Sequence, residues 1–296
     1  MTLLDGKRTS NEIKEEIKKA VNAMRFRGER VPHLAAVLVG DDGASLTYVG
    51  SKVRSCEYVG FNSTLIRLEN NISETDLLNQ IQKLNSDNNL DGYIVQLPLP
   101  KHINEEKILL AIDSKKDVDG FHPTNFGRMT LELDAFIPAT PFGIIKLLER
   151  YKVPTSGKHC VVVGRSNIVG RPISILMSQK GVSGNATVTL AHSRTENLVN
   201  LTKQADIIVM ALGIPEFLTA DMIKENACII DVGITRVVDK SKPKGYVIKG
   251  DVAFEEVSKK ADYITPVPGG VGPMTIAMLL QNTLQARQWN LSLGAQ

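Results

Sequence analysis

A strand-like run followed by two glycines, from Cys160 to Pro172, has the residue types that bind a dinucleotide pyrophosphate. The apolar residues 160–163 predict a buried strand, Gly164 a tight turn, and Gly170 the start of a helix. A glycine turn leading into a helix offers backbone N–H groups to phosphate oxygens. The spacing departs from the usual GxGxxG pattern because Arg165 and Ser166 lie between the glycines. A strand–helix turn without a ligand is the alternative interpretation.

The end of the next predicted strand reduces the weight of that alternative. An NAD-binding fold places an acidic residue about 20 residues beyond the glycine turn, where it binds the ribose 2′-hydroxyl. Here the strand ends in Ser193-Arg194, and the first carboxylate is Glu196. Together with Arg165, these side chains provide a hydroxyl and two cations, which suit a 2′-phosphate. The pattern predicts NADP rather than NAD, with a solvated surface arginine as the competing interpretation of Arg194.

Two further segments with glycine follow apolar strands, at 211–213 and 231–234. They place Gly213 and Ile234 just beyond the carboxyl ends of their strands. Small residues there allow a nicotinamide ribose to approach the backbone. Each segment by itself is weak evidence for a ligand site. Their shared position at strand ends is the stronger indication.

Tyr48 and Lys52 are four residues apart in a helix-like segment, so both side chains emerge on one face. A Tyr-xxx-Lys pair is typical of short-chain dehydrogenases, in which it follows the dinucleotide fold within the same domain. Here the pair precedes the predicted dinucleotide fold by more than about a hundred residues, and we reject that assignment. A solvated helix lysine is the alternative for Lys52.

Two other polar elements precede the glycine turn. Gln96 stands at the end of a predicted buried strand, where Pro98 and Pro100 stop the sheet ladder. The loop 116–123 contains two carboxylates, Asp117 and Asp119. Either of them could cap a turn, which is the ordinary role of aspartate in such a loop.

Strand-length apolar runs alternate with helix-like segments along the chain, which predicts βαβ units and a mainly parallel sheet. The expected strands of the first half are 34–39, 61–68 and 93–97. Those of the second half are 160–163, 186–190, 207–210, 228–232 and 263–265. A final helix is expected over 273–289 because apolar residues recur there at helical spacing.

The regular alternation fades between 117 and 141, in a loop rich in glycine, proline and asparagine. We therefore expect an α/β protein of two lobes, an N-terminal α/β domain and a Rossmann-like dinucleotide-binding domain, with a cleft between them. Residues 1–139 plus 273–296 are assigned to the substrate and catalytic domain, with the final helix packing back on it. Residues 140–272 are assigned to the NADP-binding domain.

Composition bounds the function. The net charge is +3, from 35 Lys+Arg and 32 Asp+Glu, which is too weak to indicate a nucleic-acid partner. A hydrophobic content of 43% and the lack of an apolar run of about 18 residues indicate a globular protein with no membrane partner. The three cysteines are widely spaced, which favours reduced thiols and no metal site. Acidic residues near the N-terminus argue against a transit peptide, so the expected location is the cytoplasm.

Five motifs follow one another in order along essentially the whole chain. They are Tyr48-Val49-Gly50-Ser51-Lys52, Val95-Gln96-Leu97-Pro98-Leu99-Pro100, Lys116-Asp117-Val118-Asp119-Gly120, Gly164-Arg165-Ser166-Asn167-Ile168-Val169-Gly170 and Pro268-Gly269-Gly270-Val271-Gly272-Pro273-Met274-Thr275. Together they resemble the FolD family of bifunctional methylenetetrahydrofolate dehydrogenase/methenyltetrahydrofolate cyclohydrolases.

The resemblance implies that methylenetetrahydrofolate is oxidised with NADP and that the methenyl product is then hydrolysed to 10-formyltetrahydrofolate. It implies a role in one-carbon metabolism and purine biosynthesis, tetrahydrofolate substrates, and a homodimer. Lys52 would be the general base, with a pKa lowered by burial and by a neutral partner, Gln96. Tyr48 would stack on the folate, and Asp119 would accept hydrogen bonds from the pterin.

The resemblance also assigns each candidate residue to a group. The catalytic group is Lys52, Gln96, Tyr48 and Asp119. The substrate-binding group is Tyr48, Gln96, Leu97, Asp119, Pro268, Gly269 and Gly272. The cofactor-binding group is Gly164, Arg165, Ser166, Gly170, Ser193, Arg194, Gly213, Ile234 and Thr275.

Three alternatives remain open at this point. The first is a monofunctional member of the same family. The second is another two-lobe NAD(P)-dependent dehydrogenase, such as a shikimate- or amino-acid-dehydrogenase-like enzyme, which would not need Lys52 paired with Gln96. The third is a binding module without turnover, which the presence of Lys52, Gln96 and Asp119 disfavours.

Overall fold

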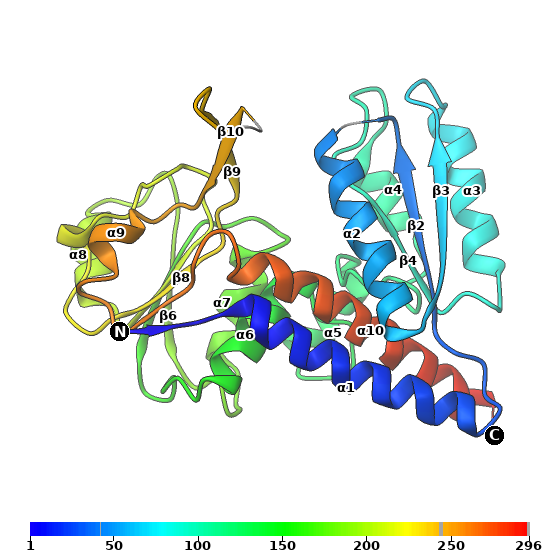
Figure 1. Ribbon diagram of the computed structural model, residues 1–296, viewed down its shortest axis with the longest axis horizontal. Helices are drawn as coiled ribbons and strands as arrows, with labels where there is room; N and C mark the ends of the chain where they lie inside the picture. The colour runs from blue at the N-terminus through cyan, green and yellow to red at the C-terminus, as the bar shows by residue number, and fades with distance from the viewer. Residues whose placement is uncertain (42, 243–244, 295–296) are drawn as a thin grey trace. The chain divides into compact units, whose positions relative to one another are not determined.

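A computed structural model describes residues 1–41, 43–242 and 245–294 and divides the chain into two compact units. Unit 1 contains Met1–Ser10 and Thr140–Thr275, and unit 2 contains Asn11–Ala139 and the chain from Ile276 onward. Each unit combines a parallel main sheet with helices (Figure 1). The predicted α/β fold with two domains is confirmed.

Unit 2 has a three-stranded parallel sheet in the order β3-β2-β4. Its strands are β2 (His33–Val39), β3 (Asn62–Leu68) and β4 (Gly92–Val95). Its helices include α2 (Gly43–Val59), α3 (Glu74–Ser86), α4 (Glu105–Ala111) and α5 (Pro123–Thr130). Six of the seven residues of β2 are buried, because a central parallel strand is covered on both faces. The apolar side of α3 packs with β2 and β4 in one core cluster.

Unit 1 has a six-stranded parallel sheet in the order β1-β11-β8-β7-β5-β6. Its strands are β1 (Thr2–Leu3), β5 (His159–Val163), β6 (Thr187–Ala191), β7 (Ile207–Met210), β8 (Cys228–Asp231) and β11 (Tyr263–Ile264). The strand order reverses at β5, since β6 lies on one side of it and β7 on the other. Ligands of open α/β sheets bind at the carboxyl ends of the strands at such a reversal.

The remaining elements complete unit 1 and connect it to unit 2. Unit 1 contains α7 (Gly170–Ser178), α8 (Leu198–Gln204), α9 (Phe254–Val257) and a 3₁₀ turn, η1 (Ala220–Met222). An antiparallel hairpin of β9 (Thr235–Val238) and β10 (Tyr246–Lys249) projects from the rest of the unit (Figure 1). The helices α1 (Gly6–Phe26), α6 (Ala139–Arg150) and α10 (Val271–Gly294) contain residues of both units.

The structure differs from the sequence-based expectations at several element boundaries. The strand expected over 93–97 ends at Val95, because the Gln96 N–H makes the last bond to β2 and the prolines after it cannot continue the ladder. Strand β1 and the β9–β10 hairpin were not predicted, since a two-residue strand carries no periodic signal.

The unit boundaries also depart from the predicted domain division. Residues 1–10 and 273–275 group with unit 1, whereas the prediction assigned them to the catalytic domain. The N-terminal residues join unit 1 because β1 pairs with β11. The predicted domain division, whose last residues 295–296 lie outside the described part of the chain, stays a prediction.

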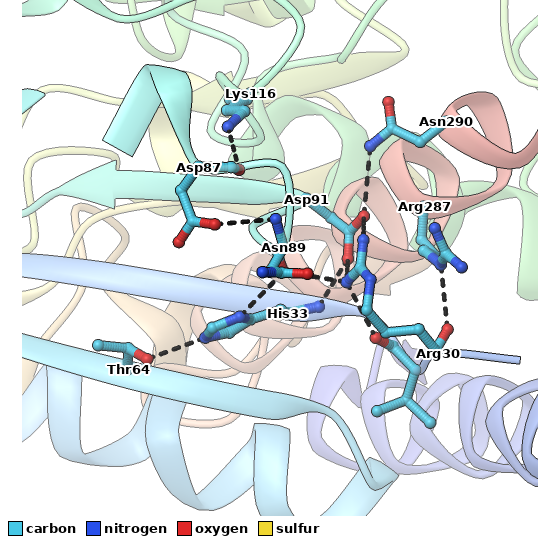
Figure 2. A network of polar contacts seen from close by, with 10 residues as sticks. Arg30, His33, Thr64, Asp87, Asn89, Asp91, Lys116, Arg287 and Asn290 are labelled. Carbon is cyan, nitrogen blue, oxygen red and sulfur yellow. Dashed lines mark hydrogen bonds and ion pairs between the residues drawn. The ribbon is translucent and has the colours of Figure 1, made fainter. Parts of the chain in front are cut away.

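A buried carboxylate, Asp91, joins three segments of unit 2 at the amino-terminal ends of β2 and β4 (Figure 2). Its oxygens accept both terminal guanidinium nitrogens of Arg30 at 2.7 and 2.8 Å and the backbone N–H of His33 at 2.8 Å. Asn290 of α10 donates to the same carboxylate at 3.2 Å. Arg287, one turn earlier in α10, donates to the carbonyl oxygen of Arg30 at 3.0 Å. These bonds hold the last helix against the strand entries of unit 2.

Replacing Asp91 with alanine is expected to lower the free energy of unfolding by about 3 kcal/mol, because Arg30, the His33 N–H and Asn290 lose their shared acceptor. Denaturant unfolding measures the change. Glu29→Gln is the control, since it breaks the exposed Arg27–Glu29 ion pair and should leave stability close to wild type. Equal stability of Asp91→Ala and wild type would contradict the anchoring role of this carboxylate.

Candidate active site

The turn after β5 has no room for side chains at its two glycines. Gly164 has a φ of +124°, and a Cβ built on it would lie 2.2 Å from the carbonyl oxygen of Ala211. A Cβ on Gly170 would lie 1.9 Å from the carbonyl oxygen of Gly164. The bare backbone therefore forms a cradle at the reversal of strand order, which fits the close approach of a pyrophosphate.

Ser166 organises the start of α7. Its Oγ accepts the backbone N–H groups of Val169 at 3.2 Å and Gly170 at 3.3 Å, which caps the helix. Arg171 donates from Nε to the carbonyl oxygen of Arg165 at 3.3 Å. The Arg165 and Ser166 side chains are exposed, while Gly164 and Gly170 are buried. Arg165 and Ser166 thus face solvent at the N-terminus of α7, and a helix N-terminus attracts anions.

The structure brings Ser193 and Arg194 to the same sheet edge as Arg165. Strands β5 and β6 are parallel neighbours, and the Gly164 N–H donates to the carbonyl oxygen of Ala191 at 2.9 Å. The loop after β6 is held by His192, whose Nδ1 accepts the N–H of Arg194 at 3.2 Å. Ser193 and Arg194 are exposed. A hydroxyl and two guanidinium groups therefore leave adjacent strand ends.

The loops after β7 and β8 end near the remaining candidates of unit 1. Gly213 is exposed with a φ of +72°, and Ile234 is 61% exposed. Ile234 lines a cavity of about 130 Å³ together with Pro268, Gly269 and Gly272. Thr275 does not line this cavity, and its hydroxyl lies 2.9 Å from that of Thr140.

In unit 2, the structure places Lys52, Gln96 and Tyr48 in contact. Lys52 extends from α2, is only 5% exposed, and donates from Nζ to Gln96 Oε1 at 3.2 Å. The same Nζ lies 4.5 Å from the centroid of the Tyr48 ring. Gln96 follows the last residue of β4, and its Nε2 donates to the carbonyl oxygen of Leu97 at 2.7 Å. That bond turns the amide so that its oxygen faces the amine.

Burial controls the charge of the lysine. It lowers the pKa of Lys52, and the Asp119 carboxylate partly opposes this effect. Burial also raises the pKa of Asp119, while the charge of Lys52 lowers it. The two groups interact electrostatically, which brings the fourth predicted catalytic residue into the same site.

The two carboxylates of the 116–123 loop have different environments. Asp117 is buried and accepts the N–H of His122 at 2.7 Å and Nδ2 of Asn125 at 2.9 Å. Burial raises the pKa of Asp117 to about 7, against the effect of these hydrogen bonds. Asp119 is half-buried. Asp117 therefore holds the turn, whereas Asp119 is the carboxylate that interacts electrostatically with Lys52.

Some residues around the site were missed by sequence reasoning. Cys56 lies one turn after Lys52 in α2 and is 1% exposed. Asp231 and Asp251 anchor the loops after β7 and β8 through backbone hydrogen bonds. Four-residue spacing from Lys52 could have indicated Cys56. Asp251 follows no regular pattern in the sequence.

Within residues 1–41, 43–242 and 245–294, no three His, Cys, Asp or Glu side chains are arranged to hold a metal ion. The helices in the same ranges include none that is long and apolar enough to cross a membrane.

The fold and the site define a two-domain α/β protein with a dinucleotide-type sheet and a buried lysine–amide pair. Residues 4–119 match the family model described as the tetrahydrofolate dehydrogenase/cyclohydrolase catalytic domain. Residues 138–291 match its NAD(P)-binding domain. The chain belongs to the tetrahydrofolate dehydrogenase/cyclohydrolase family, the FolD family.

Individual relatives cover almost the whole chain. The bifunctional protein FolD of Flavobacterium johnsoniae is 71% identical over 288 residues, covering 97% of this chain and 98% of the relative. The crystal structure of the bifunctional FolD enzyme from Campylobacter jejuni is 49% identical with a TM-score of 0.91, covering 97% and 99%. The Trypanosoma brucei enzyme, complexed with NADP and an inhibitor, is 36% identical with a TM-score of 0.92, covering 98% of each chain.

Replacing Gly164 with alanine is expected to lower the free energy of unfolding by about 3 kcal/mol, because the new methyl group meets the Ala211 carbonyl in a strained backbone region. Gly157→Ala is the matched control. Gly157 also has a positive φ, +71°, but nothing lies within 4 Å of its Cβ position, so its cost should be about 1 kcal/mol. Denaturant unfolding compares the two, and equal costs would refute the close approach of the two backbones.

Proposed function

We propose that this protein oxidises 5,10-methylenetetrahydrofolate to 5,10-methenyltetrahydrofolate with NADP and then hydrolyses the product to 10-formyltetrahydrofolate. The contact between the buried Lys52 Nζ and Gln96 Oε1 carries the proposal. Relatives named as bifunctional FolD proteins, at up to 71% identity, support both activities. A monofunctional enzyme or a different two-domain dehydrogenase is not favoured at this identity.

In the oxidation, the chain binds and orients its substrate. NADP, when bound, provides the nicotinamide carbon that accepts a hydride from the methylene bridge. The nitrogens on both sides of the bridge stabilise the resulting cation, so the protein has to supply position rather than a strong base. Asp119 can accept two hydrogen bonds from the amide and amino edge of the pterin. The Tyr48 ring offers a face for stacking.

The hydrolysis needs proton transfer, which we assign to Lys52. An ordinary lysine is protonated at neutral pH and cannot accept a proton. Burial lowers the pKa of Lys52, which increases the neutral fraction of the amine. While one N–H of that amine donates to Gln96 Oε1, its lone pair can take a proton from the water that attacks the methenyl carbon. The bond from that carbon to N5 then breaks, N5 takes up a proton, the hydroxyl proton is released, and the formyl group stays on N10. Gln96 orients the amine without adding a charge.

The cofactor preference is assigned to the exposed set at the ends of β5 and β6. Arg165, Ser193 and Arg194 offer donors to a 2′-phosphate. No carboxylate occupies the first four positions after β6, 192–195, where one would repel a phosphate. The bare cradle at Gly164 and Gly170 would hold the pyrophosphate. We further assign Pro268, Gly269 and Gly272 to substrate binding, and Gly213, Ile234 and Thr275 to cofactor binding.

We also propose that the protein acts in the cytoplasm as a homodimer, in the one-carbon metabolism that supplies purine biosynthesis. The projecting β9–β10 hairpin supports an assembly, because Val238 at its edge is 77% exposed. Light scattering on the purified chain tests it against the monomer mass of 32.4 kDa. Residues 1–139 plus 273–296 and 140–272 remain the proposed division into functional domains.

Lys52→Met is expected to reduce the cyclohydrolase rate at least about 100-fold, because water loses its proton acceptor. An absorbance assay that follows the methenyl and NADPH signals together measures both reactions. The wild-type cyclohydrolase rate should increase as the pH rises through the pKa of Lys52, which lies below the ordinary lysine value, and level off above it.

The control for this variant is Lys18→Met. Lys18 Nζ also lies over a tyrosine ring, 4.6 Å from the centroid of Tyr58, but it belongs to α1. Its loss should leave both rates close to wild type. Full cyclohydrolase activity in Lys52→Met would remove the lysine from the mechanism.

Arg194→Ala is expected to reduce kcat/KM with NADP about 10-fold or more, since a charge-assisted bond to phosphate contributes about 1.5–3 kcal/mol. The value with NAD should change little, because NAD lacks the 2′-phosphate. Steady-state kinetics with both cofactors measure the ratio. A wild-type enzyme with equal kcat/KM for NAD and NADP would contradict the assignment of all three side chains.

A further inference from the structure

Two buried carboxylates, Asp231 and Asp251, occupy the carboxyl edge of the unit 1 sheet. Asp231 ends β8 and is 3% exposed, and Asp251 is fully buried. No lysine or arginine forms an ion pair or a hydrogen bond with either carboxylate in the part of the chain that the structure describes. Burying two carboxylates without a cation is costly unless hydrogen-bond donors compensate their charge.

Both carboxylates accept hydrogen bonds from backbone N–H groups, and the bonds of Asp231 hold the segment that contains Asp251. Asp231 Oδ1 accepts from Gly233 and from Asp251, each at 2.9 Å, and its Oδ2 accepts from Val252 at 3.0 Å. Asp231 thereby fixes the segment that carries Asp251. Asp251 Oδ2 then accepts the N–H groups of Leu212 at 2.6 Å and Gly213 at 3.0 Å. The loops after β7 and β8 are thus held by one connected pair.

The glycines beside the pair show how closely the backbone packs on these oxygens. A Cβ on Gly250 would lie 1.9 Å from Asp231 Oδ2, and one on Gly233 would lie 2.3 Å from Asp251 Oδ1. Asp251 Oδ1 has no hydrogen-bond partner among the described residues. Burial, with a smaller contribution from the charge of Asp251, raises the pKa of Asp231 to about 6, against the effect of its three backbone hydrogen bonds. The two carboxylates are therefore held in fixed positions, but hydrogen bonds do not compensate all of their buried oxygens.

The loop that Asp251 holds borders the pyrophosphate cradle directly. Ala211 precedes Leu212, and its carbonyl oxygen lies against Gly164, while its N–H donates to Val163 at 2.9 Å. A shift of the 211–213 loop would move the Ala211 carbonyl that packs against Gly164 in the cradle. The other loop leads to Ile234, which lines the 130 Å³ cavity beside Pro268.

We propose that Asp231 and Asp251 are positioning residues for the dinucleotide, and that they act only through the backbone of the loops 211–213 and 232–234. This inference rests on the proposed NADP-dependent function and adds to it two residues that hold the backbone of the binding loops. The pair sets the cofactor affinity rather than the chemical steps in unit 2.

The unequal use of the oxygens predicts unequal effects of asparagine. Asp251 accepts with one oxygen only, so Asp251→Asn can keep both bonds with its carbonyl oxygen. Asp231 accepts with both oxygens, so Asp231→Asn must direct its NH₂ group toward a backbone N–H. Asp251→Leu has a similar size and no acceptor.

The experiment is a fluorescence titration of each full-length variant with NADPH, accompanied by the KM for methylenetetrahydrofolate, the cyclohydrolase rate and the thermal midpoint. Asp251→Leu and Asp231→Asn are expected to raise the Kd for NADPH about 10-fold or more, and Asp251→Asn less than about 3-fold. The KM for the folate should stay within about twofold of wild type in all three.

Asp206→Leu is the matched control. Asp206 precedes β7 at the opposite edge of the sheet, where it accepts the N–H of His159 at 2.8 Å and pairs with Lys224. Its replacement should lower the thermal midpoint without changing the Kd for NADPH. Asp251→Leu with a wild-type Kd would overturn the inference, and so would an equal rise of the Kd in Asp206→Leu.

If Asp251→Leu does not fold, the two asparagine variants decide, because equal Kd values for Asp231→Asn and Asp251→Asn overturn the inference. A wild-type protein that binds neither NADPH nor NADH contradicts the proposed function itself. A wild-type protein that binds NADPH, with variants that bind equally well, contradicts the positioning role alone.

Discussion

The free energy of keeping the Lys52 amine out of water constrains the residues around it, since an uncompensated buried ammonium group costs several kcal/mol. Unit 2 meets this constraint with a neutral acceptor, Gln96, and an aromatic face, Tyr48. The carboxylate of the half-buried Asp119 acts on the amine through its electrostatic field alone, which raises the pKa of Lys52. A direct ion pair would have stabilised the protonated form. The observed arrangement instead favours an amine that can gain and lose a proton.

The position of Gln96 depends in turn on how β4 ends. The N–H of Gln96 still donates to Val37 of the central strand at 2.9 Å, and the ladder stops there. The side chain is then fixed by its own neighbour, because Nε2 donates to the Leu97 carbonyl. The other side chains of the site come from α2, which provides Tyr48 and Lys52 from successive turns. Ordinary strand and helix geometry thus places an amide oxygen and an amine at hydrogen-bond distance.

Sequence patterns were sufficient for features that depend on local spacing. The parallel strands of both units, the glycine turn and the four-residue spacing of Tyr48 and Lys52 follow from local periodicity. The contact of Lys52 with Gln96 joins positions 44 residues apart, and only the family resemblance indicated it. The sequence spacing could not tell which of Asp117 and Asp119 holds the turn, because that depends on which carboxylate is buried. The Asp231–Asp251 pair and the short strand β1 were missed because their partners are distant in the chain.

Cys56 is a buried thiol close to the proposed catalytic lysine in the sequence of α2. It lies one turn from Lys52, and burial raises the pKa of its thiol to about 12. Burial thus disfavours the thiolate, the form that attacks electrophiles, at neutral pH. A methenyl carbon is such an electrophile. In the proposed reaction it would therefore meet water and an amine while the sulfur stays inert, so the enzyme would be protected from alkylation by its own intermediate.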